Sequence, residues 1–354
     1  MPQIHPLSLY CPSPKTLEQT RVKGVKGPTV FVDIIAKAEN HSAISNGIKN
    51  LIKNKDYLHL SAGLYWWRIK NKKGCFEGLL TGVLAEGNTQ NITTHEAVLE
   101  QRVKLFSDYL KAVGFQAEPV LLMHENSLAA ATLAKRINNR KEDFLYLLGT
   151  EQHQLWCLKP EEVTFINNFC QELDQFHLVD GHHRYASTLN LEKKGHNPSL
   201  LFSFLVAKDQ LRNLAFSWAI KEPLWADRLL QNIPPESICD RAEANIEIKA
   251  KNHSIYCQAT KEWTVVDFIV EKLLAVTAQQ KLDLKSLIDY YPPGGLSPAM
   301  AKAYPVVIDY TPLSLEEMIT LAKAQKNLPP KSTYILPKLP TGLCFTPLAK
   351  GQIK

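Results

Sequence analysis

The sequence lacks most of the features that identify a protein class at first sight. Its seven cysteines are scattered and include no Cys-x-x-Cys pair, which argues against a disulfide framework and a structural zinc knuckle. The longest apolar run, Leu200–Ala207, is far shorter than the roughly 20 residues of a membrane span. The proline-rich N-terminus lacks the basic-then-apolar pattern of a signal peptide. We therefore expect a cytoplasmic protein that does not bind a membrane.

The common nucleotide-binding and nucleophile motifs are also missing. The sequence contains no Gly-rich P-loop, no Gly-x-Gly-x-x-Gly strand turn, no Gly-x-Ser-x-Gly elbow and no kinase signature set. Any nucleotide that this protein binds is therefore held by another kind of site.

The composition is that of a soluble globular protein with more than one core, with 354 residues, 45% of them hydrophobic and 21% charged. Strand-like and helix-like segments follow one another without the regular order of a doubly wound sheet, so we expect an α+β (mixed α/β) fold. We divide the chain into an N-terminal α+β region over residues 1–125, a core over 126–225 and a C-terminal α+β region over 226–354.

Hydrophobic patterns predict several elements of the N-terminal region. Residues 28–36 read as a buried strand, and residues 65–70 and 76–85 as the two strands of a hairpin. A helix is expected over residues 95–113. Thr93 or Thr94 is its expected N-cap, and the glycine at position 114 is well placed to end it.

Positive charge is concentrated near the N-terminus. Residues 1–75 contain 12 Lys and Arg against four Asp and Glu, beside the aromatic run Tyr65-Trp66-Trp67-Arg68. Cations and stacking rings together suit single-stranded nucleic acid. We favour the simpler interpretation, in which Trp66 and Trp67 flank the hairpin and at least one ring packs in the core. Nucleic acid is therefore not an expected partner.

One stretch reads as a chemical site, namely Val-Asp-Gly-His-His-Arg-Tyr-Ala-Ser over residues 179–187. It lies between a predicted strand at 176–179 and a predicted helix at 185–194, which together with the apolar strand at 200–207 form a strand–helix–strand unit. The first N–H groups of a helix have no partner within it and suit an anion. Asp180, Gly181, His182, His183 and Arg184 would cluster at this helix start.

Two residues in this turn suit a phosphate. Gly181 lets the backbone approach a ligand, and Arg184 offers a planar fork for a phosphate or carboxylate. In the structural alternative Asp180 caps the helix and both histidines are simply exposed, but four ionisable residues in five positions favour a site. A metal chelate formed by His182 and His183 is not favoured, since adjacent side chains diverge on regular elements.

Two other segments carry candidate residues. Glu96, after His95, has two possible roles. It either interacts favourably with the dipole of the predicted helix or, if the fold brings it to the Asp180 turn, serves as a metal ligand or general base. Near the C-terminus, Lys331, Ser332 and Lys338 either complete a polyanion pocket or lie on a proline-stiffened surface crossing with solvated lysines. For this segment the residues alone favour the surface crossing.

Three segments together resemble the bacterial and archaeal family called domain of unknown function 1015. They are Leu178-Val-Asp-Gly-His-His-Arg-Tyr185, the His95-Glu96 pair ahead of a helical arginine, and Pro329-Pro-Lys-Ser-Thr-Tyr334 followed by Pro337-Lys338 and Thr341-Gly342-Leu343. The resemblance covers roughly residues 90–345. The early Pro-Pro-Tyr-Asp segment of the family is not found here, so the chain resembles a divergent and shortened member.

The central turn also resembles, more loosely, the ParB and sulfiredoxin superfamily. There a Gly-x-His-Arg or Gly-x-x-Arg turn at a helix N-terminus holds nucleotide phosphates, and Gly181, His183 and Arg184 match that pattern. His182 stands where sulfiredoxins have their reactive cysteine, which rules out that chemistry. Free-serine kinases have the same superfamily core and a comparable Asp-Gly-x-His-Arg turn. The resemblance implies that residues 126–225 form a ParB/sulfiredoxin-like core with a phosphate site.

Residues and resemblance together favour a nucleotide-dependent phosphotransferase that acts on a small polar metabolite, with a free amino acid such as serine as one candidate. The expected cofactors are Mg²⁺ and ATP or ADP. The alternatives are a non-catalytic nucleotide-binding regulator of the ParB-like type and a phosphohydrolase. The sequence leaves the oligomeric state open, a homo-oligomer included.

The residues of this hypothesis fall into three groups. The expected catalytic residues are Asp180, Glu96 and His182. Asp180 and Glu96 are the expected magnesium ligands. The phosphates and the nucleotide would be bound by Gly181, His183, Arg184, Lys331, Ser332 and Lys338.

Overall fold

The computed structural model describes residues 2–13, 30–85, 91–194, 200–251, 253–259, 263–275, 284–329 and 331–348. The chain divides into two compact units. Unit 1 comprises Met1–Thr94, Val98–Leu211 and Pro337–Lys354, and unit 2 comprises His95–Ala97 and Arg212–Leu336. The three-region division made from the sequence stays a prediction.

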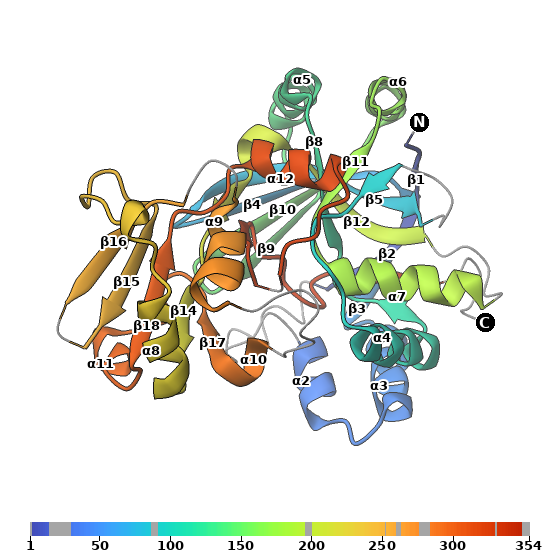
Figure 1. The fold of residues 1–354 in the computed structure, drawn as a ribbon. Helices are drawn as coiled ribbons and strands as arrows, with labels where there is room; N and C mark the ends of the chain where they lie inside the picture. The colour runs from blue at the N-terminus through green and yellow to red at the C-terminus, as the bar shows by residue number, and fades with distance from the viewer. Residues whose placement is uncertain are drawn as a thin grey trace. The chain divides into compact units, whose positions relative to one another are not determined.

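Within the described residues, unit 1 is built on a nine-stranded mixed sheet with the order β6-β11-β8-β12-β5-β4-β10-β9, in which β1 also pairs with β5 (Figure 1). β6 is parallel to β11 and β8 is parallel to β12, whereas the other pairs are antiparallel. The strands are β1 (Ile4–His5), β4 (Tyr65–Asn71), β5 (Gly74–Leu84), β6 (Ile92–Thr93), β8 (Val120–His124), β9 (Phe144–Leu148), β10 (Glu151–Cys157), β11 (Phe176–Asp180) and β12 (Leu200–Ala207).

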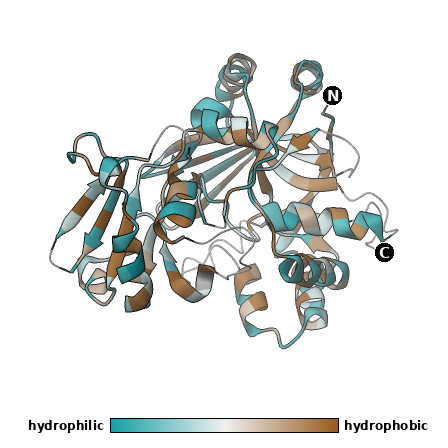
Figure 2. Ribbon diagram, in the orientation of Figure 1, coloured by the Kyte–Doolittle hydropathy of each residue, from teal (hydrophilic) through white to brown (hydrophobic). Residues whose placement is uncertain are grey.

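Helices lie on both sides of this sheet. Figure 1 shows α5 (Ser127–Asn138) and α6 (Pro160–Gln171) above it and α4 (Glu100–Val113) below it. The apolar faces of α5 and α6 pack on the sheet, and Figure 2 shows hydrophobic residues concentrated along its strands. α4 packs on α7 (His182–Lys193), where the Ser107 hydroxyl donates to the Ser187 carbonyl at 3.2 Å.

The chain from β11 through α7 to β12 is the strand–helix–strand unit that the sequence predicts. The two strands are not neighbours, because β8 lies between them. The helix begins at His182, three residues earlier than expected. His182, His183 and Arg184 therefore form its first turn.

A smaller core in unit 1 shows that the strand predicted at residues 28–36 is wrong. Residues 28 and 29 lie outside the described part of the chain, and the rest belong to the helix α2 (Val30–Lys37). Phe31 packs fully buried in this core, with Ile34 and Ile35 against it. Their spacing of three and four residues places them on one face of a helix. The apolar content of so short a run does not by itself distinguish a strand from a helix, which is why the prediction failed. The remaining elements around this core are β2 (Leu7–Pro12), α3 (His41–Lys53), β3 (Tyr57–Gly63), β7 (Phe115–Gln116) and β20 (Thr346–Pro347).

The helix predicted over residues 95–113 is shorter than expected. It begins at Glu100, its N-cap is Leu99 without a side-chain cap, and it ends at Gly114, as predicted, with a φ of 80°. Thr93 lies on β6, so the predicted N-cap is wrong. His95–Ala97 belong to unit 2, where Glu96 pairs with Leu328 in a parallel bridge. This tertiary pairing overrides the local helical pattern.

The predicted hairpin is confirmed by β4 and β5, which pair from Tyr65 opposite Leu80 to Asn71 opposite Gly74. Trp66 and Trp67 are 1% and 4% exposed. Because these rings are buried in the sheet, they provide no stacking surface for nucleic acid.

Unit 2 contains, among its described residues, a five-stranded antiparallel sheet with the order β16-β15-β18-β14-β17. Its strands are β14 (Ser217–Ile220), β15 (Ile246–Ala250), β16 (Ser254–Cys257), β17 (Ile288–Tyr291) and β18 (Val306–Tyr310). The core of this unit is formed by one face of the sheet, α8 (Pro223–Gln231), α9 (Val265–Asp267) and the π-helical turn Phe268–Leu273. The unit also contains β13 (Arg212–Leu214), α10 (Leu284–Leu287), α11 (Pro298–Ala301), α12 (Leu315–Lys323) and β19 (Tyr334–Leu336).

Candidate functional site

The predicted anion-binding turn lies at the end of β11 in unit 1. Gly181 adopts a φ of +96°, and a Cβ atom added there would lie 2.7 Å from Nη2 of Arg184 and 2.8 Å from Cγ1 of Val120. A side chain is therefore excluded by the backbone and by the space. The room that glycine leaves is taken by the guanidinium of Arg184, which folds back over the turn.

The first turn of α7 carries no side-chain cap. Its first helical hydrogen bond runs from the Tyr185 N–H to the Gly181 carbonyl at 3.0 Å. Asp180 therefore does not cap the helix, as the structural alternative required. Such a helix end offers N–H groups and a partial positive charge to an anion.

Arg184 lies in a chain of alternating charges. It forms ion pairs with Glu118 and, at 3.4 Å from Nη2 to Oδ2, with Asp180. The other oxygen of Asp180 accepts from Nζ of Lys338 at 3.1 Å, and Oε2 of Glu118 accepts from the Thr341 hydroxyl at 2.6 Å. The two cations balance the two carboxylates, so an incoming phosphate competes with Glu118 and Asp180 for Arg184.

Arg184 remains a cation at neutral pH. Desolvation by the surrounding protein lowers the pKa of its guanidinium to about 10, and the adjacent carboxylates favour its charged form. Its side chain is 24% exposed, so part of the group can still reach a ligand.

The two adjacent histidines have different surroundings. His182 is buried, at 6% exposure. Nε2 of His183 accepts a hydrogen bond from the Leu99 N–H at 3.2 Å and so joins the start of α7 to the N-cap of α4. In this arrangement Nε2 of His183 is already occupied by a backbone donor.

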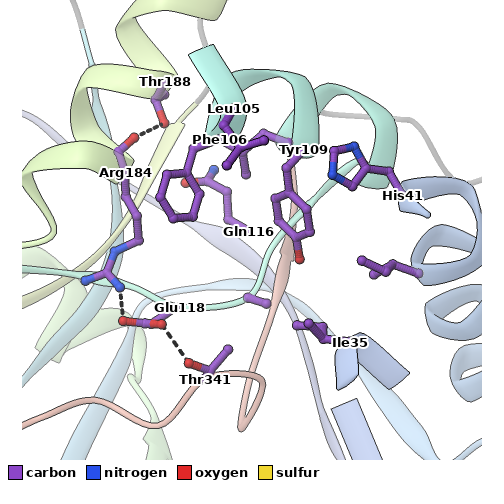
Figure 3. Close-up of a pocket in the computed structure, with 13 residues that line it drawn as sticks. Ile35, His41, Leu105, Phe106, Tyr109, Gln116, Glu118, Arg184, Thr188 and Thr341 are labelled. Atoms are coloured by element: carbon purple, nitrogen blue, oxygen red, sulfur yellow. Dashed lines mark hydrogen bonds and ion pairs between the residues drawn. The ribbon is translucent and has the colours of Figure 1, made fainter. Parts of the chain in front are cut away.

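A cavity of about 390 Å³ opens beside Arg184, still within unit 1 (Figure 3). Polar residues line one side of it: Gln116, Glu118, Arg184, Thr188 and Thr341. The remaining wall is mainly apolar and includes Ile35, Ile44, Leu105, Phe106, Tyr109 and Leu110. A pocket of this size and lining is typical of a small-molecule site.

The structure brings one of the distant candidates to the turn. Lys338 contacts Asp180, although the two residues are 158 positions apart. Glu96, Lys331 and Ser332 belong to unit 2. Nζ of Lys331 lies 5.4 Å from the centre of the Phe216 ring, and the buried Ser332 hydroxyl donates to the Pro329 carbonyl at 2.6 Å. The roles predicted for these three residues stay predictions.

Glu118 and Thr341 belong to this cluster but are not among the site residues predicted from the sequence. The one local signal for Glu118 is a carboxylate directly before Pro119 and the buried strand β8. Since β8 runs antiparallel to β11, the start of β8 lies beside the end of β11, next to Asp180. That pairing joins segments about 60 residues apart and is not visible in the sequence.

The described residues contain neither a metal-binding cluster nor a membrane-spanning helix. In the part of the chain that the structure describes, no group of three or more His, Cys, Asp and Glu side chains could hold a metal ion. Among the same residues, no helix is long and apolar enough to cross a membrane.

Comparison with known proteins identifies the family. The protein-family model described as "Protein of unknown function (DUF1015)" matches residues 28–285 of this chain. This is more than half of the chain, which therefore belongs to this family. The match begins before the resemblance inferred from the motifs and ends before the Pro329-Pro-Lys-Ser-Thr-Tyr334 segment. No curated protein matches the chain.

Several solved structures are similar in fold. SbnI with a C-terminal truncation, from Staphylococcus aureus, has a TM-score of 0.47 and 16% identity, and the match covers 78% of this chain and 90% of that one. A free serine kinase in complex with AMP has a TM-score of 0.39 and 18% identity, with coverages of 71% and 86%. A conserved hypothetical protein from Pyrococcus furiosus has a TM-score of 0.38 and 16% identity, with coverages of 71% and 90%. The mixed α/β class expected from the sequence is confirmed by the large mixed sheet, and the ParB/sulfiredoxin-like core stays a prediction.

Proposed function

We propose that this protein is a nucleotide-dependent phosphotransferase that acts on a small polar metabolite. The observation that carries the proposal is the position of Arg184, whose guanidinium folds over the left-handed Gly181 at the uncapped start of α7. A cation and a helix N-terminus at one point form a phosphate-binding arrangement. Lys338, 3.1 Å from Asp180, adds a second positive charge.

Phosphoryl transfer depends mainly on positioning and on neutralising charge. A phosphate at the turn would draw Arg184 away from Glu118 and Asp180, and Lys338 would follow the same negative charge. The carboxylate of Asp180, whose side chain is 32% exposed, would then accept the proton of the acceptor hydroxyl. His182 is buried in the first turn of α7, so in this proposal it positions the helix rather than contacting the substrate.

Magnesium does not fit Asp180 as the charges stand. Both oxygens of this carboxylate face cations, at 3.1 Å for Lys338 and 3.4 Å for Arg184. Hard cations need carboxylate or phosphate oxygens without competing positive charge. We therefore derive no catalytic step through a metal ion.

The experiment that tests the proposed reaction is a product assay. The protein is incubated with ADP or ATP, with and without Mg²⁺, and with candidate acceptors, with serine first because free-serine kinases have a comparable Asp-Gly-x-His-Arg turn. We expect a phosphorylated acceptor whose formation is lost in Arg184→Ala. Release of phosphate without any acceptor would instead indicate a phosphohydrolase. If no nucleotide is consumed with any acceptor, the phosphotransferase is wrong.

A second candidate is a nucleotide-binding regulator, favoured by the links between Arg184 and the C-terminal segment. Asp180 accepts a hydrogen bond from Lys338, and Glu118 accepts one from Thr341. A ligand that binds Arg184 would therefore change both contacts. A regulator predicts nucleotide binding with a conformational or oligomeric change and no product. Limited proteolysis and light scattering, each with and without ADP, would detect such a change.

A further inference from the structure

The cavity beside Arg184 is larger than a phosphate site needs. Arg184 and Glu118 form one side of it, and beyond them the wall is formed mainly by apolar residues of α2, α3 and α4. We infer that this cavity binds the base of the nucleotide, so that α4 reads the base while α7 holds the phosphates. This inference rests on the proposed function and names the subsite that would set its nucleotide specificity.

Two apolar side chains of α4 at the cavity are exposed to solvent. Leu105 is 60% exposed and Phe106 is 39% exposed. A flat apolar ligand would cover these side chains, and burial of apolar surface is favourable. Phe106 also offers an aromatic face, on which any base can stack.

Several polar groups of the wall already have partners within the protein. The Gln116 amide donates to the Leu200 carbonyl at 2.6 Å and accepts from the Phe202 N–H at 3.0 Å. The Thr188 hydroxyl donates to the Arg184 carbonyl at 3.0 Å. Gln116 and Thr188 therefore shape the cavity, and the groups that can form hydrogen bonds with a ligand lie at the two ends of the cavity.

Figure 3 shows these ends on opposite sides, with Arg184 and Glu118 at one and His41 at the other, and Phe106 and Tyr109 between them. The Tyr109 ring stands edge-on to His41, with 5.6 Å between the ring centres. Within the described residues, the Tyr109 hydroxyl makes no hydrogen bond. Burial raises its pKa to about 12, which keeps it a neutral donor and acceptor.

This distribution of polarity favours one class of ligand. A fatty acyl chain has a single polar end, whereas a nucleoside has a sugar at one end, a flat ring, and hydrogen-bonding groups on the far edge of the base. The cavity likewise has a charged end, an apolar middle and a second polar end. A volume of about 390 Å³ lies within the range of small-molecule sites.

Isothermal titration calorimetry with adenosine, ADP and pyrophosphate tests the inference. Phe106→Ala should weaken adenosine and ADP by about tenfold or more, because stacking is lost, and leave pyrophosphate unchanged. Tyr109→Phe should weaken adenosine and ADP less, with the fold intact. The matched control is Leu128→Ala on α5, where an equally apolar side chain is 78% exposed and no ligand should be affected.

The outcomes separate the inference from the proposed function. If ADP and pyrophosphate bind through Arg184 and neither Phe106→Ala nor Tyr109→Phe affects ADP or adenosine, the base lies elsewhere and only the inference fails. If adenosine binds and Phe106→Ala weakens it while pyrophosphate does not bind, the cavity is a nucleoside site and the phosphotransferase fails. If neither adenosine nor ADP binds the wild-type protein, the inference is overturned.

Discussion

Unit 1 contains two arginine–glutamate pairs whose surroundings differ. Arg68 on β4 pairs with Glu77 on β5 at 2.7 Å, with side chains only 10% and 15% exposed, and its guanidinium lies 5.0 Å from the centre of the Trp156 ring. Arg184 pairs with Glu118, with exposures of 24% and 28%, beside an uncapped helix end and a cavity. The first pair is enclosed by the sheet, whereas the second is partly exposed and, in our proposal, exchanges its partners for a ligand.

The comparison shows that the type of ion pair says little about its role. Arg68 and Glu77 lie directly opposite each other in the β4–β5 register, so the hairpin alone brings them together. The Arg184 cluster instead draws on three segments that are distant in sequence, namely Glu118, the Asp180–Arg184 turn and the C-terminal segment with Lys338 and Thr341. A closed pair contributes to the fold, and an open one leaves binding energy available for a ligand.

The largest expected effect is on the closed pair. Arg68→Met leaves the Glu77 carboxylate without its partner in a mostly buried place, which should lower the free energy of unfolding by about 3 kcal/mol. Arg184→Met should lower it by at most about 1 kcal/mol, since that cluster is partly solvated. Urea denaturation of both variants measures the difference. Equal losses would show that the two pairs have the same structural role.

The buried His124 of the same sheet should make the stability of the protein depend on pH in acid. Burial lowers the pKa of His124, at the end of β8, to about 4, so the unfolded chain binds its proton first as the pH falls. The free energy of unfolding is therefore unaffected by His124 above pH ~6.5 and falls as the pH drops towards ~4, with a total loss of about 3 kcal/mol. His124→Leu should show a flatter pH dependence of unfolding. An unchanged slope would contradict this assignment.

The turn beneath Arg184 should be less costly to disturb. Gly181→Ala combines a φ of +96° with contacts to Arg184 and Val120, and should destabilise the protein by about 2 kcal/mol while weakening nucleotide binding. The matched control is Gly149→Ala, where φ is +60° and no atom lies within 4 Å. That variant should lose about 1 kcal/mol from backbone strain alone and bind normally. Equal effects on binding would remove the special role of the turn.

The smallest expected effect sharpens the view of the open pair. Glu118→Gln keeps an acceptor for the Thr341 hydroxyl but removes a negative charge that competes for Arg184. Pyrophosphate affinity should therefore rise about threefold, measured by calorimetry at constant ionic strength. A fall in affinity would mean that Glu118 itself contributes to ligand binding.

Local patterns predicted much of the fold and the conformation of the turn at Gly181. The hairpin of β4 and β5, the buried β12 and the turn at Gly181 all follow from alternation, apolar runs and turn residues. The strand predicted at residues 28–36 is wrong, because the apolar residues of this short segment fit both a strand and a helix. Only the burial of Phe31 in the smaller core distinguishes the two. Glu96 was placed on a helix, but a pairing with Leu328 removes it from α4.

The contacts that join the Asp180–Arg184 turn to distant parts of the chain could not be predicted in this way. Glu118, Lys338 and Thr341 reach this turn because β8 runs antiparallel to β11 and the C-terminal segment contacts Asp180 and Glu118. These are long-range pairings, and a single sequence carries no signal for them. The residues of the turn could therefore be named from the sequence, and their role in phosphate binding stays a prediction, whereas the ion pair between Arg184 and Glu118 could not be foreseen.

The most direct test of the central claim is the binding of ADP to Arg184→Ala, measured by calorimetry beside wild type and Arg136→Ala. Arg136 is an exposed arginine on α5, with its guanidinium 4.7 Å from the centre of the Phe165 ring, so it controls for the loss of a charge from unit 1. We predict that Arg184→Ala binds ADP about tenfold or more weakly, as expected when a charged hydrogen bond is lost, and that Arg136→Ala binds like wild type. Equal affinity in all three proteins would contradict the assignment of the Asp180–Arg184 turn as a phosphate site.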